Sequence, residues 1–145
     1  MRRIKREFVI FAYVLLAIFF FWVILGFVLK TDTPVVIISS GSMEPALSAG
    51  DVVFVRGTDT GDLRVGDVIV YNCPSKKDLC VRENELLAHR IVEINETNGI
   101  KTKGDANDRV DRWLVGFSWV KGNMFFRIPF LGKPIVVLRQ IMGVV

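Results

Sequence analysis

The chain begins with an uninterrupted apolar segment, which limits what the rest of the chain can be. Residues 8–29, FVIFAYVLLAIFFFWVILGFVL, contain no charged residue, no proline and one glycine. At ~1.5 Å per residue, this segment would form a helix of ~33 Å, enough to cross a bilayer core of ~30 Å. A single segment can cross only as a helix, because lipid offers the backbone no hydrogen-bond partners. The sequence therefore predicts a transmembrane helix over residues 8–29.

Two other interpretations of the apolar segment fit less well. A domain in a chain of 145 residues rarely buries a helix that is apolar on all sides. A cleaved signal peptide usually has an apolar core of about 7–15 residues, followed by a small-x-small cleavage site. Here the core is longer, and the following residues, GFVLKTDTP, offer no such site. We therefore expect a permanent anchor.

The charges beside the anchor predict its orientation. Residues 1–7 (MRRIKRE) carry four basic residues against Glu7, a net charge of +3, whereas Lys30 and Asp32 offset each other just after the anchor. Basic flanks favour the cytoplasmic side of a membrane. We therefore expect residues 1–7 to be a basic cytoplasmic flank and residues 31–145 to form a domain on the extracytoplasmic or lumenal face.

The composition excludes several classes of protein. Hydrophobic residues make up 51% of the chain and charged residues 23%, which excludes a disordered tail or a collagen-like fibre. The formal net charge is +4, and because residues 1–7 hold +3 of it, the other 138 residues carry only +1. Without a basic domain, nucleic acid is not an expected partner.

The residues after the anchor predict a small, mostly β domain. Short runs rich in Val and Ile alternate with turn signals built from Gly, Asp and Asn, a pattern typical of strands joined by tight turns. We find no sustained helical period after residue 30. We expect strands near residues 35–40, 52–55, 68–71, 86–94, 100–103, 114–120 and 135–138.

The C-terminal part of the domain is unusually apolar. Phe125, Phe126, Ile128 and Phe130 are numerous for so small a surface. They either belong to the core or contact the membrane interface near the anchor, and we favour the second. The last run, IVVLRQIMGVV, contains Arg139 and is too short for a second span.

The two cysteines, Cys73 and Cys80, enclose the loop CPSKKDLC between two strand-like runs. Outside the cytoplasm a short-loop disulfide is favoured, and the alternative is two free thiols. A zinc site is not expected, because His89 is the single histidine that could join the two cysteines, and no further soft ligand is present. We expect no metal and no cofactor.

The sharpest motif is SSGSMEP over residues 39–45, directly after the first strand-like run. In an extended chain Ser40 and Ser42 present their hydroxyls to the same side. Gly41 between them leaves room for a substrate backbone, and Pro45 stops the strand from continuing. A serine at such a turn can be a nucleophile, and the turn can supply donors to an oxyanion. By composition alone, however, Ser-Gly-Ser is more often a polar turn.

A base for that serine has one natural candidate. His89 lies in the strand-like run LAHRIV, and imidazole is the side chain best suited to accept a proton near neutral pH. By itself a lone histidine on a strand is more often structural. Asp105, Asp108 or Asp111 of the acidic turn GDANDRVD could orient the imidazole, or they are solvated residues paired with neighbouring arginines. The spacing does not choose between these alternatives.

Taken in order, SGSMEP, GDVVFV, GDVIVY, AHRIVEI and KGDANDRVDRW resemble the motifs of signal peptidase I. The resemblance is to the His-type branch of archaea and the endoplasmic reticulum, and it covers nearly the whole chain, basic flank and single anchor included. It implies a membrane-anchored serine endopeptidase whose β-domain removes the signal peptides of exported proteins after small residues. The CPSKKDLCVRENE insert before His89 is unlike the short connection expected there.

The resemblance also implies residue roles. Ser42 matches the nucleophile, which would form an acyl-enzyme, and Ser40 matches an oxyanion donor that acts beside the Ser42 backbone N–H. His89 stands where bacterial relatives place a lysine, which implies Ser–His chemistry with His89 as general base. Asp105 and Asp111 match two aspartates of the branch. We favour Asp111 as the group that orients His89 and Asp105 as a support of the site.

The same resemblance names the expected partners: signal peptides of secretory preproteins, the lipid bilayer, and the protein-export channel or accessory subunits. Two other classes fit the sequence less well. An anchored subunit of the pilin kind usually has a glycine before its helix and an acid just inside it, but here no glycine precedes Gly26 and Glu7 lies outside the apolar run. A catalytically silent homologue would not need Ser42, His89 and both aspartates.

Overall fold

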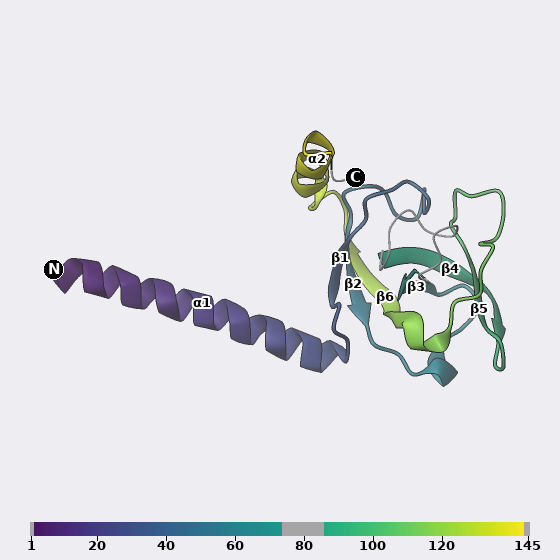
Figure 1. The fold of residues 1–145 in the computed structure, drawn as a ribbon, viewed down its shortest axis with the longest axis horizontal. Helices are drawn as coiled ribbons and strands as arrows, with labels where there is room; N and C mark the ends of the chain where they lie inside the picture. The colour runs from purple at the N-terminus through teal and green to yellow at the C-terminus, as the bar shows by residue number, and fades with distance from the viewer. Residues whose placement is uncertain (1, 74–85, 144–145) are drawn as a thin grey trace.

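The computed structural model describes residues 2–73 and 86–143. A long helix, α1 (Arg2–Leu29), extends away from a β-domain, as Figure 1 shows. The part of α1 over Arg6–Leu29 is long and apolar enough to cross a membrane. Its side chains from residue 6 to residue 24 are all exposed, so the β-domain does not cover them. The predicted anchor, residues 8–29, lies within this helix.

The β-domain is built on one antiparallel sheet in the described residues, with the strand order β1-β2-β6-β3-β4-β5. Strand β6 lies between β2 and β3, so the centre of the sheet joins segments that are far apart in the sequence. The strands are β1 (Val35–Ile37), β2 (Val52–Arg56), β3 (Val68–Asn72), β4 (Leu86–Asn95), β5 (Gly99–Lys103) and β6 (Val120–Ile128). Two 3₁₀ turns, η1 (Thr60–Asp62) and η2 (Phe117–Trp119), and a helix, α2 (Lys133–Ile141), complete it.

The expected fold class, one N-terminal apolar helix followed by a mostly β domain, is confirmed. Five of the expected strands are also present, although the first ends at Ile37. The strand expected over 114–120 is wrong, because this segment makes only an isolated bridge, Ile100 to Val115, before η2. Strand β6 then begins at Val120, and most of it was not predicted from the sequence.

The strand expected over 135–138 is also wrong, because these residues lie in α2. A short apolar run does not by itself distinguish a strand from a helix. The local signal that decides here is Pro134, which lies in the first turn of α2, where its fixed φ suits the helix and its missing N–H costs nothing.

Among the described residues, two hydrophobic clusters form the core. The first packs between β3, β4 and β5 and contains Leu63, Ile69, Tyr71, Ile91, Ile100 and Val115. The second packs under the turn that follows β1 and contains Ile38, Met43, Leu47, Val53 and Val68. Cys73 is also buried, but Cys80 lies outside the described residues, so the Cys73–Cys80 disulfide stays a prediction.

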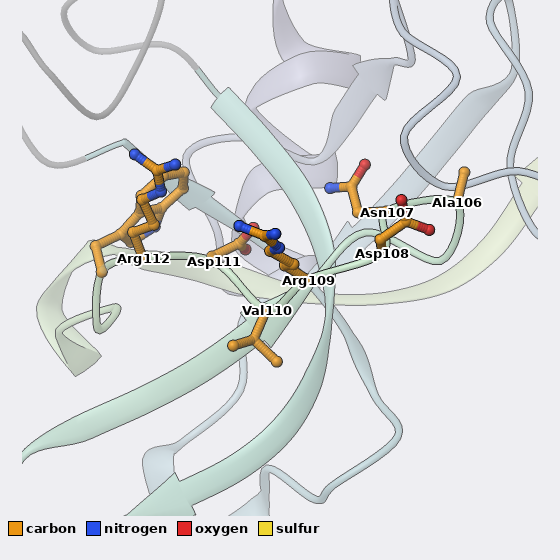
Figure 2. Close-up of a pocket in the computed structure, with 8 residues that line it drawn as sticks. Ala106, Asn107, Asp108, Arg109, Val110, Asp111 and Arg112 are labelled. Carbon is orange, nitrogen blue, oxygen red and sulfur yellow. The ribbon is translucent and has the colours of Figure 1, made fainter.

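The loop between β5 and η2 turns one carboxylate inward. Its residues 106–113 line a surface hollow of about 670 Å³, shown in Figure 2. Asp108, Arg109 and Val110 of this loop are exposed, whereas Asp111 is only 9% exposed. The acidic turn is therefore not uniformly solvated.

The end of α1 is bonded directly to the sheet. The backbone N–H of Gly57, just after β2, donates to the carbonyl of Leu29 over 2.7 Å. Thr31 Oγ1 donates to the carbonyl of Lys121 in β6 over 2.8 Å, and Lys121 Nζ lies 2.7 Å from Asp32 Oδ2. The hydrogen bond from Lys121 lowers the pKa of Asp32. The helix therefore meets the domain at a bonded junction between β2 and β6.

This junction predicts a strong effect of a single methyl group. A Cβ added at Gly57 would overlap the carbonyl oxygen of Lys30, so we expect Gly57→Ala to lower the free energy of unfolding by about 2–3 kcal/mol. Gly61→Ala is the matched control, because a Cβ there meets no atom within 4 Å. Thermal unfolding of both variants in detergent measures the difference, and equal midpoints would contradict the proposed steric role of Gly57.

Candidate active site

Ser42 lies on a tight turn that the core holds in place. The turn follows β1, and its hydrogen bonds run from Glu44 N to Gly41 O over 3.0 Å and from Leu47 N to Met43 O over 2.8 Å. Met43 and Leu47 are 1% and 0% exposed, so burial of apolar side chains on both sides of the turn stabilises it. Ser42 itself is half-buried, which leaves its hydroxyl accessible at the edge of the sheet.

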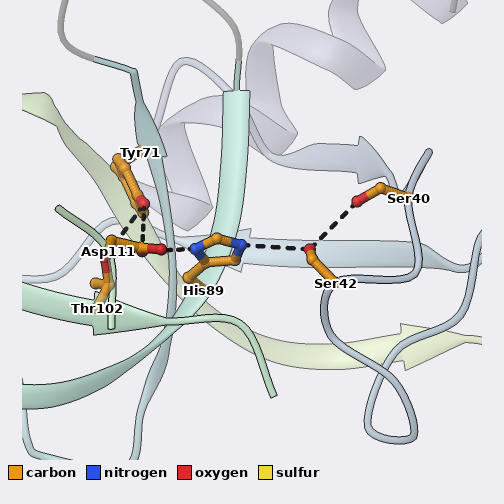
Figure 3. A network of polar contacts seen from close by, with 6 residues as sticks. All are labelled: Ser40, Ser42, Tyr71, His89, Thr102 and Asp111. Atoms are coloured by element: carbon orange, nitrogen blue, oxygen red, sulfur yellow. Dashed lines mark hydrogen bonds and ion pairs between the residues drawn. The ribbon is translucent and has the colours of Figure 1, made fainter. Parts of the chain in front are cut away.

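His89 faces that hydroxyl from β4. It pairs with Ile69 of β3 and is 6% exposed, so packing restricts its ring to one position. Figure 3 shows His89 Nε2 directed at Ser42, with 3.3 Å between Nε2 and Ser42 Oγ. This distance is slightly longer than an ordinary hydrogen bond, as is common in enzymes without substrate.

Asp111 contacts the other side of the imidazole ring. Its backbone N–H donates to the carbonyl of Thr102 over 2.8 Å, which pins the loop to β5. Its Oδ2 atom lies 2.7 Å from His89 Nδ1, 2.6 Å from Thr102 Oγ1 and 3.3 Å from the Tyr71 hydroxyl. A single carboxylate oxygen is therefore the acceptor for donors from three strands (Figure 3).

These contacts determine which way the protons point. An ionised carboxylate only accepts hydrogen bonds, so the proton of a neutral His89 belongs on Nδ1. Nε2 is then the acceptor, and the hydroxyl of Ser42 is the donor that faces it. This tautomer is the one a general base for serine needs.

Tyr71 and Thr102 are the two polar partners that sequence reasoning missed. Both are 0% exposed, and their hydroxyl oxygens lie 3.2 Å apart. Burial raises the pKa of Tyr71, and the nearby charge of Asp111 adds to the shift, so this phenol stays a proton donor. Nothing in the local sequence marks either residue, because a Tyr and a Thr on strands are ordinary β residues.

Asp105 is bonded to Arg90, the residue after His89. Its carboxylate forms a two-pronged ion pair with Arg90, at 2.8 Å from Nε and 2.6 Å from the terminal NH2 nitrogen. This hydrogen bonding lowers the pKa of Asp105 and raises that of Arg90. Next to it, Ala106 N donates to the carbonyl of Ser42 over 2.9 Å. A Cβ at Gly104 would lie 2.6 Å from that carbonyl, so the approach requires glycine.

A small groove adjoins the serine. Its volume is about 60 Å³, and it lies between the segment around β1 and the start of β4. Ser40 and Ser42 lie at its polar side, and their hydroxyl oxygens are 3.2 Å apart. The sequence did not identify substrate-binding residues, and this groove supplies candidates: Val36, Ile37, Ile38, Ser39, Leu86, Leu87 and Ala88.

In the part of the chain that the structure describes, no group of three or more His, Cys, Asp or Glu side chains could hold a metal ion.

Acyl transfer to a serine needs a base within hydrogen-bond reach and a group that orients the base, and the arrangement around His89 provides both. The chemistry that fits is that of a serine peptidase. A family model described as signal peptidase, peptidase S26, matches residues 6–95, more than half of the chain. The chain belongs to this family, whose members are serine endopeptidases that remove signal peptides. With its one apolar N-terminal helix, it is a single-pass membrane protein.

Similar proteins span most of the chain. The signal peptidase complex catalytic subunit SEC11 of Ogataea parapolymorpha is 31% identical over 144 residues, covering 89% of this chain and 81% of the relative. The corresponding subunit of Pyrenophora tritici-repentis is 33% identical, and that of Leptosphaeria maculans is 34% identical. Each of these two alignments covers 96% of this chain and 83% of the relative.

The Arg90–Asp105 pair predicts a pH-dependent contribution to stability. Because the folded pKa of Asp105 lies below its ordinary value of 3.8, the pair stabilises the fold above that pH and loses its effect as the pH falls through the lowered pKa. We expect Asp105→Asn to lower the midpoint of thermal unfolding near neutral pH. The difference between the midpoints of the variant and of wild type should become smaller in acid. Asp108→Asn, at an exposed position, is the control. A gap of constant size at every pH would contradict the prediction.

The contacts of Asp111 predict the effect of removing one hydroxyl. Thr102→Val keeps the shape of the side chain but deletes a donor to a buried carboxylate, so we expect a loss of about 1–3 kcal/mol in unfolding free energy. Because the donor holds Asp111 rather than substrate, kcat should fall while KM stays the same. Thr97→Val, in the exposed turn between β4 and β5, is the control. A kcat equal to that of wild type would show that Thr102 does not position Asp111.

Proposed function

We propose that Ser42 is the nucleophile of this signal peptidase and that His89 is its general base. His89 accepts the Ser42 proton while Ser42 Oγ attacks the peptide carbonyl, then returns the proton to the leaving amine, and an acyl-enzyme forms on Ser42. Water, activated by His89, hydrolyses the ester and frees Ser42. The observation that carries this proposal is the unbroken contact series from Ser42 Oγ through both ring nitrogens to Asp111 Oδ2.

Asp111 and Asp105 have different roles in this proposal. Asp111 orients the imidazole and stabilises its positive charge while His89 holds the proton, as its 2.7 Å contact supports. Asp105 holds its own loop against Arg90 of β4, and the N–H of the neighbouring Ala106 in that loop supports the carbonyl of Ser42. These contacts support Asp111, and not Asp105, as the residue that orients His89.

Ser40 and the backbone N–H of Ser42 stabilise the oxyanion in this scheme. The Ser40 hydroxyl is exposed and lies on the same side of the turn as Ser42, where a developing negative charge would be within reach. Such donors contribute most when they are already positioned before the reaction.

The groove beside Ser42 limits the substrate to small side chains. A groove of about 60 Å³ would accept an alanine-sized group and exclude large ones, which agrees with signal peptides cut after small residues. The substrate would bind as an extended strand between the β1 segment and the start of β4.

We also propose an orientation for the chain. Residues 1–7 are the cytoplasmic flank, residues 8–29 cross the bilayer, and residues 31–145 form the catalytic domain on the extracytoplasmic or lumenal face. The basic flank supports this orientation. Ser42 follows Leu29 by only 13 residues, so cleavage takes place close to the bilayer surface.

The relatives are named as catalytic subunits of a signal peptidase complex. By analogy, we propose that this chain works with accessory subunits and near the protein-export channel. The exposed surface of α1 leaves room for other membrane helices as well as for lipid.

Cleavage of a preprotein with an Ala-x-Ala site tests the mechanism. In detergent or in vesicles we expect Ser42→Ala, His89→Ala and Asp111→Asn to lower kcat/KM by about 10³-fold or more, and Ser40→Ala by about 10²–10³-fold. Ser118→Ala is the control, because Ser118 is exposed on η2. This variant should cleave the preprotein at the wild-type rate. The products are identified by mass spectrometry.

The failures would have distinct meanings. Full activity of Ser42→Ala would exclude the nucleophile, and full activity of His89→Ala would place the base elsewhere. If only Asp105→Asn were inactive while Asp111→Asn cleaved normally, the two aspartates would have the opposite roles.

A further inference from the structure

Glu44 carries a carboxylate close to the nucleophile, and the mechanism above gives it no role. The hydrogen bond from Glu44 N to Gly41 O, 3.0 Å long, folds the chain back just after Ser42. A Cβ placed at Gly41 would lie 3.4 Å from Glu44 Cδ and 3.5 and 3.8 Å from its two carboxylate oxygens. The carboxylate therefore lies against Gly41, the residue between Ser40 and Ser42.

The Glu44 carboxylate differs from the other two carboxylates of the site because it has no bonding partner. Asp111 is bonded to His89, and Asp105 is bonded to Arg90. Within residues 2–73 and 86–143, by contrast, the carboxylate of Glu44 forms no hydrogen bond and no ion pair. The side chain is also exposed. Its negative charge is therefore available to a molecule that binds at Ser42.

The carboxylate lies outside the groove beside Ser42. Ser40 and Ser42 line that groove, but Gly41 and Glu44 do not. In the mechanism proposed above, the groove holds the part of the substrate before the cut, so the part after the cut leaves Ser42 on the side away from the groove. His89, which protonates the leaving amine, does not line the groove either.

We propose that Glu44 is a specificity-determining residue for the part of the substrate that follows the cut. Its carboxylate favours a basic residue directly after the cleavage site and disfavours an acidic one. This specificity rests on the proposed roles of Ser42 and the groove, which place the leaving side next to the turn. Because Gly41 has no side chain, the carboxylate of Glu44 borders the space that a substrate backbone would enter there.

Coulomb's law gives the expected size of this preference. For an exposed carboxylate the effective dielectric constant is close to that of water, so a unit charge at about 8 Å changes kcat/KM by roughly 2–3-fold. A lysine after the cut gains this factor and a glutamate loses it. The two factors multiply, so we expect Glu44 to favour lysine over glutamate by about 5–10-fold.

A competition assay tests this proposal. The full chain in detergent cleaves a mixture of preproteins that share one Ala-x-Ala site and differ only in the first residue after the cut, which is Lys, Gln or Glu. Competition in one mixture gives the ratio of the kcat/KM values, and this ratio does not depend on the fraction of active enzyme. We expect the Lys-to-Glu ratio of wild type to exceed that of Glu44→Gln by about 5–10-fold. The ratio of Glu44→Lys should lie below both.

Glu96→Gln is the matched control, because it removes the same charge from the exposed turn between β4 and β5. This variant should keep the wild-type ratio. An identical ratio in wild type and in Glu44→Gln would overturn the proposal, and so would an equal fall in Glu96→Gln.

Salt gives a second readout that needs no substitution. At 1 M salt the screening length is about 3 Å, so the Lys-to-Glu ratio of wild type should approach that of Glu44→Gln. A wild-type ratio that does not change with salt would also overturn the proposal. These ratios are measured for any enzyme that cleaves the site, whereas the Ser42 mechanism fails if Ser42→Ala remains active. The two failures are therefore distinguishable.

Discussion

The site depends on one buried carboxylate oxygen, Asp111 Oδ2. A carboxylate at 9% exposure would be costly without donors, because a buried charge is stable only when it is paired and hydrogen-bonded. Here His89, Thr102 and Tyr71 supply these donors from three neighbouring strands. The same oxygen therefore joins the loop after β5 to the sheet and fixes the orientation of the imidazole.

The loop after β5 contacts both His89 and the turn that carries Ser42. Ala106 N supports the carbonyl of Ser42, and the adjacent Asp105 is paired with Arg90, the residue after His89. The positions of Ser42 and His89 are thus coupled through a single loop and a single strand. Asp111 of this turn touches the histidine, and Asp105 is bonded to the arginine that follows it.

The sequence predicted the apolar anchor and five of the strands, because both follow from hydrophobic periods within short segments. It did not predict α2 or most of β6. The run at 135–138 fits either a strand or a helix by its hydrophobic pattern alone, and the local signal for a helix is Pro134 in the first turn of α2. Around β6, Gly122, Asn123 and Pro129 interrupt the strand pattern. Its place between β2 and β3 depends on partners far away in the sequence.

By itself the sequence determined the chemical groups of the site: a serine at a turn, a single histidine on a strand and a cluster of aspartates. Only the tertiary structure decided which of them meet, because 47 residues separate Ser42 from His89 and 22 separate His89 from Asp111. Tyr71 and Thr102 illustrate the same limit. Their hydroxyls are ordinary on isolated strands, and they become part of the site only because β3, β4 and β5 pack side by side, so that the two hydroxyls converge on one carboxylate oxygen.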